Sequence, residues 1–132
     1  MKFNRFSFRV RYSETDKMGV VYHGNYAQYL EMGRVEWLRA LGISYKSLED
    51  SGVMLPVINM QVNFKKSAYY DDELTVITTI KNIPTVRISF EYEIVNQFDE
   101  LLVTAETQLV FMDMERKRPI KCPDSILNAL YS

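Results

Sequence analysis

The chain has 132 residues, of which 47% are hydrophobic and 25% charged, and its formal net charge is −1. This length suits one domain, and the hydrophobic content excludes a disordered chain. A net charge near zero gives no field that would attract nucleic acid. No apolar run reaches the length of a membrane span, and the N-terminus lacks the apolar core of a signal peptide. The one cysteine, Cys122, cannot form an intrachain disulfide, so we expect a cytoplasmic protein.

The predicted elements begin with a strand at residues 5–12, in which apolar side chains alternate with Arg and Ser. A period of two places four side chains on one buried face: Phe6, Phe8, Val10 and Tyr12. Apolar residues at helical spacing then predict one long helix over residues 26–41, with Asn25 as its N-cap and Gly42 at its end. Gly33, in the middle of that helix, indicates close packing against another backbone.

A short helical segment follows at residues 44–51, and Pro123 and Asp124 open a predicted C-terminal helix. The remaining segments are rich in β-branched residues and are predicted to form strands at residues 53–64, 73–83, 86–94 and 101–112. Short connections favour antiparallel pairing of these strands. The sheet must bury one face, and the long helix is the one large element available, so we expect an α+β sheet wrapped around a central helix. Such a sheet has open edges, and pairing of one edge with a second copy predicts a homodimer.

The most informative segment lies between the first strand and the long helix. Glu14 and Asp16 stand at a turn, and His23, the one histidine of the chain, comes shortly before the helix. Backbone N–H groups and the dipole at a helix N-terminus can hold a developing negative charge. A carboxylate beside such a helix end is the minimal equipment for attack on a carbonyl. Asp16 followed by Gly19 also fits an ordinary structural turn.

This segment carries a resemblance to a known family, over Tyr12, Glu14-Thr15-Asp16, Gly19-Val20-Val21-Tyr22-His23 and Asn25-Tyr26. The chain resembles hotdog-fold thioesterases of the 4-hydroxybenzoyl-CoA thioesterase-like family, particularly the acyl-CoA thioesterases found beside bacterial Tol–Pal genes. Weaker matches are Glu31, Arg34, Asp71-Asp72 and the segment 119–123. The resemblance implies a single hotdog thioesterase domain over residues 1–132. It also implies hydrolysis of an acyl-CoA thioester without cofactor or metal, by a homodimer or homotetramer.

The resemblance also implies roles for individual residues. Asp16 becomes the catalytic carboxylate, which either attacks the thioester to give a mixed anhydride or deprotonates a water molecule. His23 becomes the second catalytic position, where the backbone N–H, the side chain or neither faces the thioester carbonyl; we favour the backbone N–H. The Tol–Pal subgroup often has Asp at the position of Glu14.

Several further residues are candidates for substrate binding. Tyr12 either bonds the Asp16 carboxylate, lines the acyl pocket or packs in the core, and Glu31 either faces the site across a dimer or, as we favour, pairs with Arg34. Arg and Lys side chains can hold the phosphates of CoA. The substrate-binding candidates are Tyr12, Tyr22, Asn25, Glu31, Lys65 and Arg87, and the other basic candidates are Lys66, Arg116 and Arg118.

Other functions fit the sequence less well. A hotdog dehydratase or hydratase uses a histidine and an acid at a different spacing, and a non-catalytic acyl-thioester-binding or scaffold protein would not need Asp16. The sequence contains no Gly-x-Ser-x-Gly elbow, no glycine-rich phosphate loop and no clustered Cys/His set, so a serine hydrolase and a zinc enzyme are disfavoured. The acyl group, and the choice between CoA and acyl carrier protein, are left open.

Overall fold

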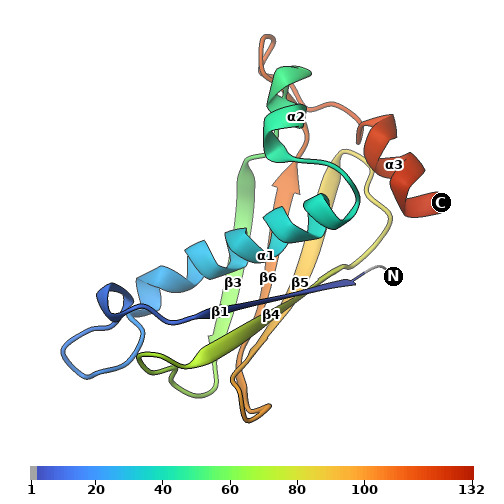
Figure 1. Cartoon of the computed structure of the whole chain (residues 1–132). Helices are drawn as coiled ribbons and strands as arrows, with labels where there is room; N and C mark the ends of the chain where they lie inside the picture. Colours follow the sequence, from blue (N-terminus) through green and yellow to red (C-terminus); the bar gives the residue numbers. More distant parts are fainter. Residues whose placement is uncertain (1–2) are drawn as a thin grey trace.

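The computed structural model describes residues 3–132 and shows an antiparallel sheet with one long helix, α1 (Tyr26–Ala40), lying across one face (Figure 1). The five strands, in spatial order, are β1 (Phe3–Arg9), β4 (Glu73–Ile80), β5 (Arg87–Val95), β6 (Leu101–Val110) and β3 (Val57–Phe64). Every neighbouring pair in the sheet is antiparallel. The predicted α+β architecture, a sheet wrapped around one long helix, is therefore confirmed.

The core lies between α1 and the sheet. The helix buries a stripe that includes Tyr29, Leu30 and Trp37, and Trp37 packs edge-on against Phe90 of β5 with ring centroids 5.2 Å apart. Burial of large apolar side chains of this kind stabilises a fold by about 1.5–3 kcal/mol each. The stripe repeats at helical spacing, which is why the sequence pattern located this helix well.

At Gly33, α1 packs closely on β4. A Cβ atom added there would lie 2.6 Å from Thr78 Oγ1 and 2.7 Å from Val76 Cγ1. The prediction that Gly33 packs closely against another element is correct. The prediction that a neighbouring backbone is the contact is wrong, because two side chains of β4 occupy the space. A glycine is needed because even one methyl group would displace these buried side chains.

The predicted strand at residues 53–64 divides into two. β2 (Val53–Met54) pairs with β7 (Met112–Asp113) in a separate two-stranded sheet, while β3 joins the main sheet. Pro56 lies between them and has no N–H with which to continue a ladder. The remaining elements are the 3₁₀ turns η1 (Tyr12–Glu14) and η2 (His23–Asn25), and the helices α2 (Tyr45–Asp50) and α3 (Asp124–Tyr131).

The prediction that the first strand continues to Tyr12 is wrong. β1 ends at Arg9, and Tyr12 lies in η1 with 77% of its surface exposed. The Arg11 amide donates a 2.8 Å hydrogen bond to the Glu14 carboxylate instead of pairing with a neighbouring strand. This local bond turns the chain away from the sheet, because short side chain–backbone bonds compete with strand ladders. Of the helices in residues 3–132, none combines the length and apolar character that a membrane crossing requires.

Candidate active site

Asp16 lies at the tip of a short hairpin that connects β1 to α1. The Asp16 amide donates to the Val20 carbonyl (2.9 Å), and the Gly19 amide donates to the Asp16 carbonyl (3.0 Å). Gly19 has φ +81°, a left-handed conformation that glycine adopts without strain. Asp16 Oδ1 accepts a 2.8 Å bond from the Met18 amide, while Oδ2 has no hydrogen-bond partner among residues 3–132. The carboxylate is therefore exposed, held in one orientation, and still has a free oxygen.

The hairpin is fixed to the body of the molecule on its second arm. Val21 is buried, its amide donates to the Ala68 carbonyl (2.9 Å), and Val20 forms a β-bridge with Tyr69. Thr15 and Val21 pair across the hairpin. These bonds leave the turn at its tip little freedom to move relative to the segment that follows β3.

The helical backbone begins at His23. η2 runs from His23 to Asn25 and continues directly into α1, and the Tyr26 amide donates to the His23 carbonyl. The first N–H groups of a helical segment have no intrahelical acceptor, so the His23 amide is available to an incoming oxygen at the positive end of the helix. The exposed His23 ring lies on the Tyr22 ring, with centroids 4.5 Å apart. Figure 1 shows this end of α1 beside the loop from β1.

Asp16 and His23 do not touch each other within one chain. The Tyr22 amide donates to the Glu14 carbonyl, and the Asp16 amide donates to the Val20 carbonyl. Val20 therefore lies opposite Asp16 in the hairpin, and His23 lies three residues beyond Val20. Three steps of extended chain measure roughly 10 Å along the backbone.

Asn25 is the N-cap residue of α1, as predicted, although its side chain does not act as the cap. Asn25 occupies the N-cap position, but its backbone is helical (φ −80°, ψ −15°) and its side chain makes no cap bond. Because η2 precedes α1, the Tyr26 amide already donates a hydrogen bond to the His23 carbonyl. Asn25 Nδ2 instead donates a 2.8 Å bond to the Glu14 carbonyl.

Glu14 is a buried carboxylate that sequence reasoning left without a role. Oε1 accepts from the Arg11 amide (2.8 Å) and from the Tyr29 hydroxyl (2.9 Å), and Oε2 accepts from Arg11 Nη2 (2.9 Å). Burial alone would raise the pKa of Glu14, but the Arg11 bonds and the Tyr29 hydroxyl outweigh it and hold the pKa below its ordinary value. The same burial, together with the Glu14 carboxylate, raises the pKa of Tyr29. The spacing Arg11-x-x-Glu14 was the one signal for this cluster.

Glu31 and Arg34 lie farther along α1, beside β3. Arg34 Nη2 is 4.0 Å from the exposed Glu31 carboxylate. The favoured Glu31–Arg34 ion pair is therefore present, at a distance that is long for an ion pair. Arg34 itself is buried. Burial lowers the pKa of Arg34, but the Tyr92 and Tyr45 hydroxyls raise it by more, so its pKa lies above the ordinary value. Both charged residues line a hollow of about 580 Å³ that also contains Val57 of β3.

The basic candidates lie at opposite ends of the sheet, Lys65 at one end and Arg87 at the other. Lys65 follows β3, close to Ala68 and hence to the Asp16 hairpin, and the adjacent Lys66 pairs with Glu100 at 2.7 Å. Arg87 opens the nine-residue β5, roughly 26 Å along the strand from its last residue, Val95. Val95 pairs with Thr75 of β4, near the end of β1 from which the chain continues to Asp16. Arg116 and Arg118 lie beyond β7, next to the Asp113 turn at the end where Arg87 lies. One chain therefore does not bring these arginines to Asp16.

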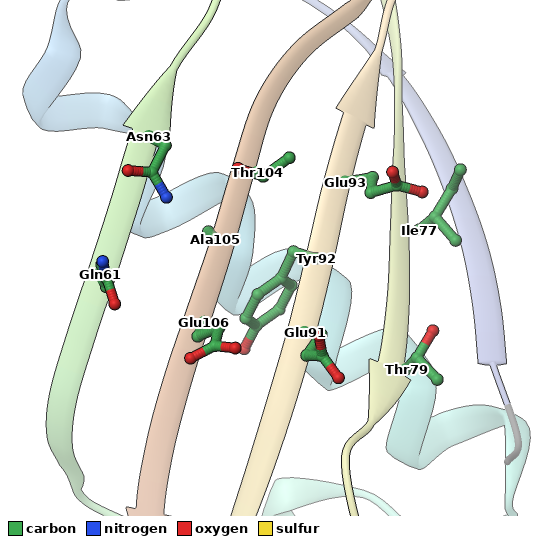
Figure 2. Close-up of a pocket in the computed structure, with 10 residues that line it drawn as sticks. All are labelled: Gln61, Asn63, Ile77, Thr79, Glu91, Tyr92, Glu93, Thr104, Ala105 and Glu106. Atoms are coloured by element: carbon green, nitrogen blue, oxygen red, sulfur yellow. The ribbon is translucent and has the colours of Figure 1, made fainter.

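A second hollow, of about 540 Å³, lies on the opposite face of the sheet from α1 (Figure 2). Its lining mixes polar and apolar side chains, and Glu91 of β5 stands directly opposite Glu106 of β6. Asp16 and His23 are not part of this lining.

No group of three or more His, Cys, Asp or Glu side chains in residues 3–132 is arranged to hold a metal ion. An antiparallel sheet wrapped around one long helix is the hotdog arrangement.

The chain belongs to the thioesterase-like superfamily, whose family model matches residues 10–130. It is similar to the putative acyl-CoA thioesterase YneP of Bacillus subtilis, with 34% identity over 92% of this chain and 88% of that relative. The acyl-CoA thioester hydrolase YbgC of Shigella flexneri is 35% identical over 93% of this chain and 92% of its own length. The structure of a DHNA-CoA thioesterase from Staphylococcus aureus superimposes with a TM-score of 0.93 and 35% identity, over 99% of this chain and 90% of that one. The predicted family and hotdog fold are thus confirmed, and membership of the Tol–Pal subgroup stays a prediction.

Proposed function

We propose that this protein is an acyl-CoA thioesterase, which hydrolyses a thioester to a free acid and CoA. The observation that carries the proposal is the exposed Asp16 carboxylate, held by the Met18 amide on a turn anchored beside the N-terminal end of α1. The relatives named for acyl-CoA and DHNA-CoA hydrolysis support the substrate class. Free thiol released from a panel of aromatic and aliphatic acyl-CoAs, measured with a thiol-trapping dye, tests it. No release from any member of the panel would favour a binding or scaffold protein.

In this proposal, Asp16 supplies the attacking oxygen. Either Oδ2 attacks the thioester carbon to give a mixed anhydride that water then hydrolyses, or the carboxylate removes a proton from a water molecule that attacks directly. Both routes consume one water, break the C–S bond and release the CoA thiol and the acid. A thiolate is a good leaving group, so neither route needs a strong general acid.

The N-terminal end of α1 polarises the carbonyl in this proposal. The His23 amide donates to the thioester oxygen, where negative charge develops during attack, and the helix dipole adds to this stabilisation. The His23 side chain then has a minor part, because its ring packs against Tyr22 and no hydrogen bond from residues 3–132 orients it toward a substrate. Tyr12 and Tyr22 are exposed aromatic residues of the same loop, and we assign both to contacts with the substrate.

We propose that the working unit is a homodimer, or two dimers in a homotetramer. Both sheet edges, β1 and β3, are unpaired within residues 3–132. Edge β1 carries Arg5 and Arg9, charges that discourage strand pairing, whereas the eight residues of β3 include no charge. Four apolar side chains of β3 are 43–55% exposed: Val57, Ile58, Met60 and Phe64. Pairing β3 with its copy would bury them and extend the sheet across both chains.

A dimer through β3 also completes the substrate site in this proposal. Glu31 lies beside the hollow that reaches β3, so a second chain on that edge would bring Glu31 next to the interface. Lys65 is placed for a CoA phosphate of its own chain, while Arg87 would serve a site only if the partner contributes it. Asn25 acts indirectly, through its bond to the Glu14 carbonyl. The single cysteine is buried and free, which supports a reducing, cytoplasmic location.

A further inference from the structure

Glu14 occupies the point at which four segments meet. Its side chain is 8% exposed, and the carboxylate receives bonds from the loop after β1, through the Arg11 amide and guanidinium, and from α1, through the Tyr29 hydroxyl. Tyr29 is itself fully buried and packs on Phe8, with ring centroids 4.6 Å apart. The carboxylate therefore links the loop after β1 to the first turn of α1.

The backbone of the same residue holds the other two segments. The Glu14 carbonyl accepts a 2.9 Å bond from the Tyr22 amide and a 2.8 Å bond from Asn25 Nδ2. One residue thus receives bonds from the hairpin arm after Asp16, from η2 and from α1, and it stands two residues before Asp16. Bonds to a buried, ionised carboxylate are shorter and stronger than neutral ones, so this junction is stiff.

We propose that Glu14 is a positioning residue, which sets the distance and angle between the Asp16 carboxylate and the His23 amide. This inference rests on the proposed thioesterase function, because only then do those two groups act on one carbonyl. Glu14 does not touch the reacting atoms: all its side-chain bonds face Arg11 and Tyr29. A misplacement of about 1 Å in a reacting geometry can lower a rate about 100-fold. Loosening this junction should consequently affect the chemical step more than substrate binding.

Two variants test the junction from opposite sides. Glu14→Gln keeps the shape of the side chain but removes its charge, and Tyr29→Phe removes one hydroxyl and leaves the carboxylate in place. The matched control is Tyr92→Phe, which removes a hydroxyl bonded to Thr107 Oγ1 at 2.5 Å in the same core. Each variant is purified, its melting temperature is recorded, and kcat and KM are measured on the best acyl-CoA of the panel.

We expect kcat to fall about 10-fold or more in both Glu14→Gln and Tyr29→Phe, with KM within about twofold of the wild type. Tyr92→Phe should lower the melting temperature by a similar amount and keep the wild-type kcat. Wild-type kcat in both junction variants would overturn the inference and leave the thioesterase proposal standing. An equal fall of kcat in Tyr92→Phe would also overturn it, because the loss would then follow from general destabilisation.

A measurement without substrate separates this inference from the proposed function. Hydrogen exchange of the Gly19 and Tyr22 amides, which donate to Asp16 and Glu14 carbonyls, should accelerate at least about 10-fold in Glu14→Gln and not in Tyr92→Phe. Unchanged exchange in Glu14→Gln would refute the junction even if kcat fell. If the wild type hydrolyses no thioester, the thioesterase proposal fails, and the positioning role fails with it whatever the exchange rates show.

Discussion

The Tyr29 hydroxyl donates a 2.9 Å hydrogen bond to the Glu14 carboxylate, and both residues are buried. Tyr29 belongs to α1 and Glu14 to the loop that carries Asp16, so this bond ties the helix to the candidate catalytic turn. The helix supplies the amide that would face a carbonyl, and the turn supplies the carboxylate that would attack it.

Asp16→Asn should fold normally and lose most of its hydrolytic activity. The change keeps the side-chain shape and the Oδ1 acceptor for the Met18 amide, but it removes the base or nucleophile. Loss of a general base lowers turnover by about 10²–10⁴-fold. The matched control is Asp99→Asn, at an exposed turn residue with φ +61°, a conformation that asparagine tolerates. Near-wild-type kcat in purified Asp16→Asn would show that another group attacks the thioester.

Two replacements of His23 separate its backbone from its side chain. His23→Ala keeps the amide, and we expect kcat within a few-fold of the wild type. His23→Pro removes the N–H, and we expect a loss of about 10²–10³-fold, the usual effect of deleting one donor to a developing oxyanion. Proline is tolerated at the first helical position, and Tyr22 has φ −62° and ψ 131°, which suits a residue before proline. Circular dichroism checks the fold, and equal losses in the two variants would assign the role to the imidazole.

Met60→Lys should prevent dimer formation and abolish turnover. Met60 is 48% exposed on edge strand β3, and a lysine there would place a charge in the expected interface. The control is Tyr131→Lys, at a 72% exposed position of α3. Light scattering at the assay concentration should report a monomer for the first variant and the wild-type mass for the second. A fully active monomer would place the whole site within one chain and remove any role for Glu31 across an interface.

The stability contributed by Glu14 should depend on pH. Its pKa is lowered from an ordinary value of 4.5 in the folded state, so the ionised carboxylate favours folding. This contribution is complete above the unfolded pKa and is lost as the pH falls through the folded value. Melting temperatures of the wild type and Glu14→Gln should therefore differ most at neutral pH and converge as the pH falls below the ordinary value of 4.5 and through the lower folded pKa. A constant difference across that range would mean that the charge of Glu14 does not stabilise the fold.

Gly33→Ala should destabilise the protein, although alanine favours helices. The added methyl group would meet Thr78 Oγ1 and Val76 Cγ1 at 2.6 and 2.7 Å, and overpacking of this kind costs about 1–3 kcal/mol. Thr78→Ser removes a methyl group and lets the hydroxyl rotate away, so the double variant should recover part of the loss. Chemical denaturation of the four proteins measures both effects. No loss in Gly33→Ala would show that α1 shifts freely on the sheet.

The sequence by itself located α1, four of the five strands of the main sheet and the Asp16 turn. These features depend on local periodicity: a stripe at helical spacing, alternation at a period of two, and an Asp and Gly that suit a turn. The sequence pattern predicts the fifth strand, β3, and β2 as one strand, because a continuous apolar segment does not show where the chain passes from one sheet to another. The end of β1 was misplaced for a similar reason, since Tyr12 continues the alternation although the Arg11–Glu14 bond has already turned the chain.

Only the tertiary structure decided which polar groups meet. The partner of Glu14 is Tyr29, fifteen residues away, and the partner of the Asn25 side chain is the Glu14 carbonyl, so no local pattern could indicate either bond. Arg87 is plausible as a phosphate ligand by charge, but the direction of β5 carries it to the far end of the sheet from the Asp16 of its own chain. Periodicity reports which face of an element is buried, whereas side-chain contacts depend on how distant elements are brought together, and that follows from packing of the whole chain.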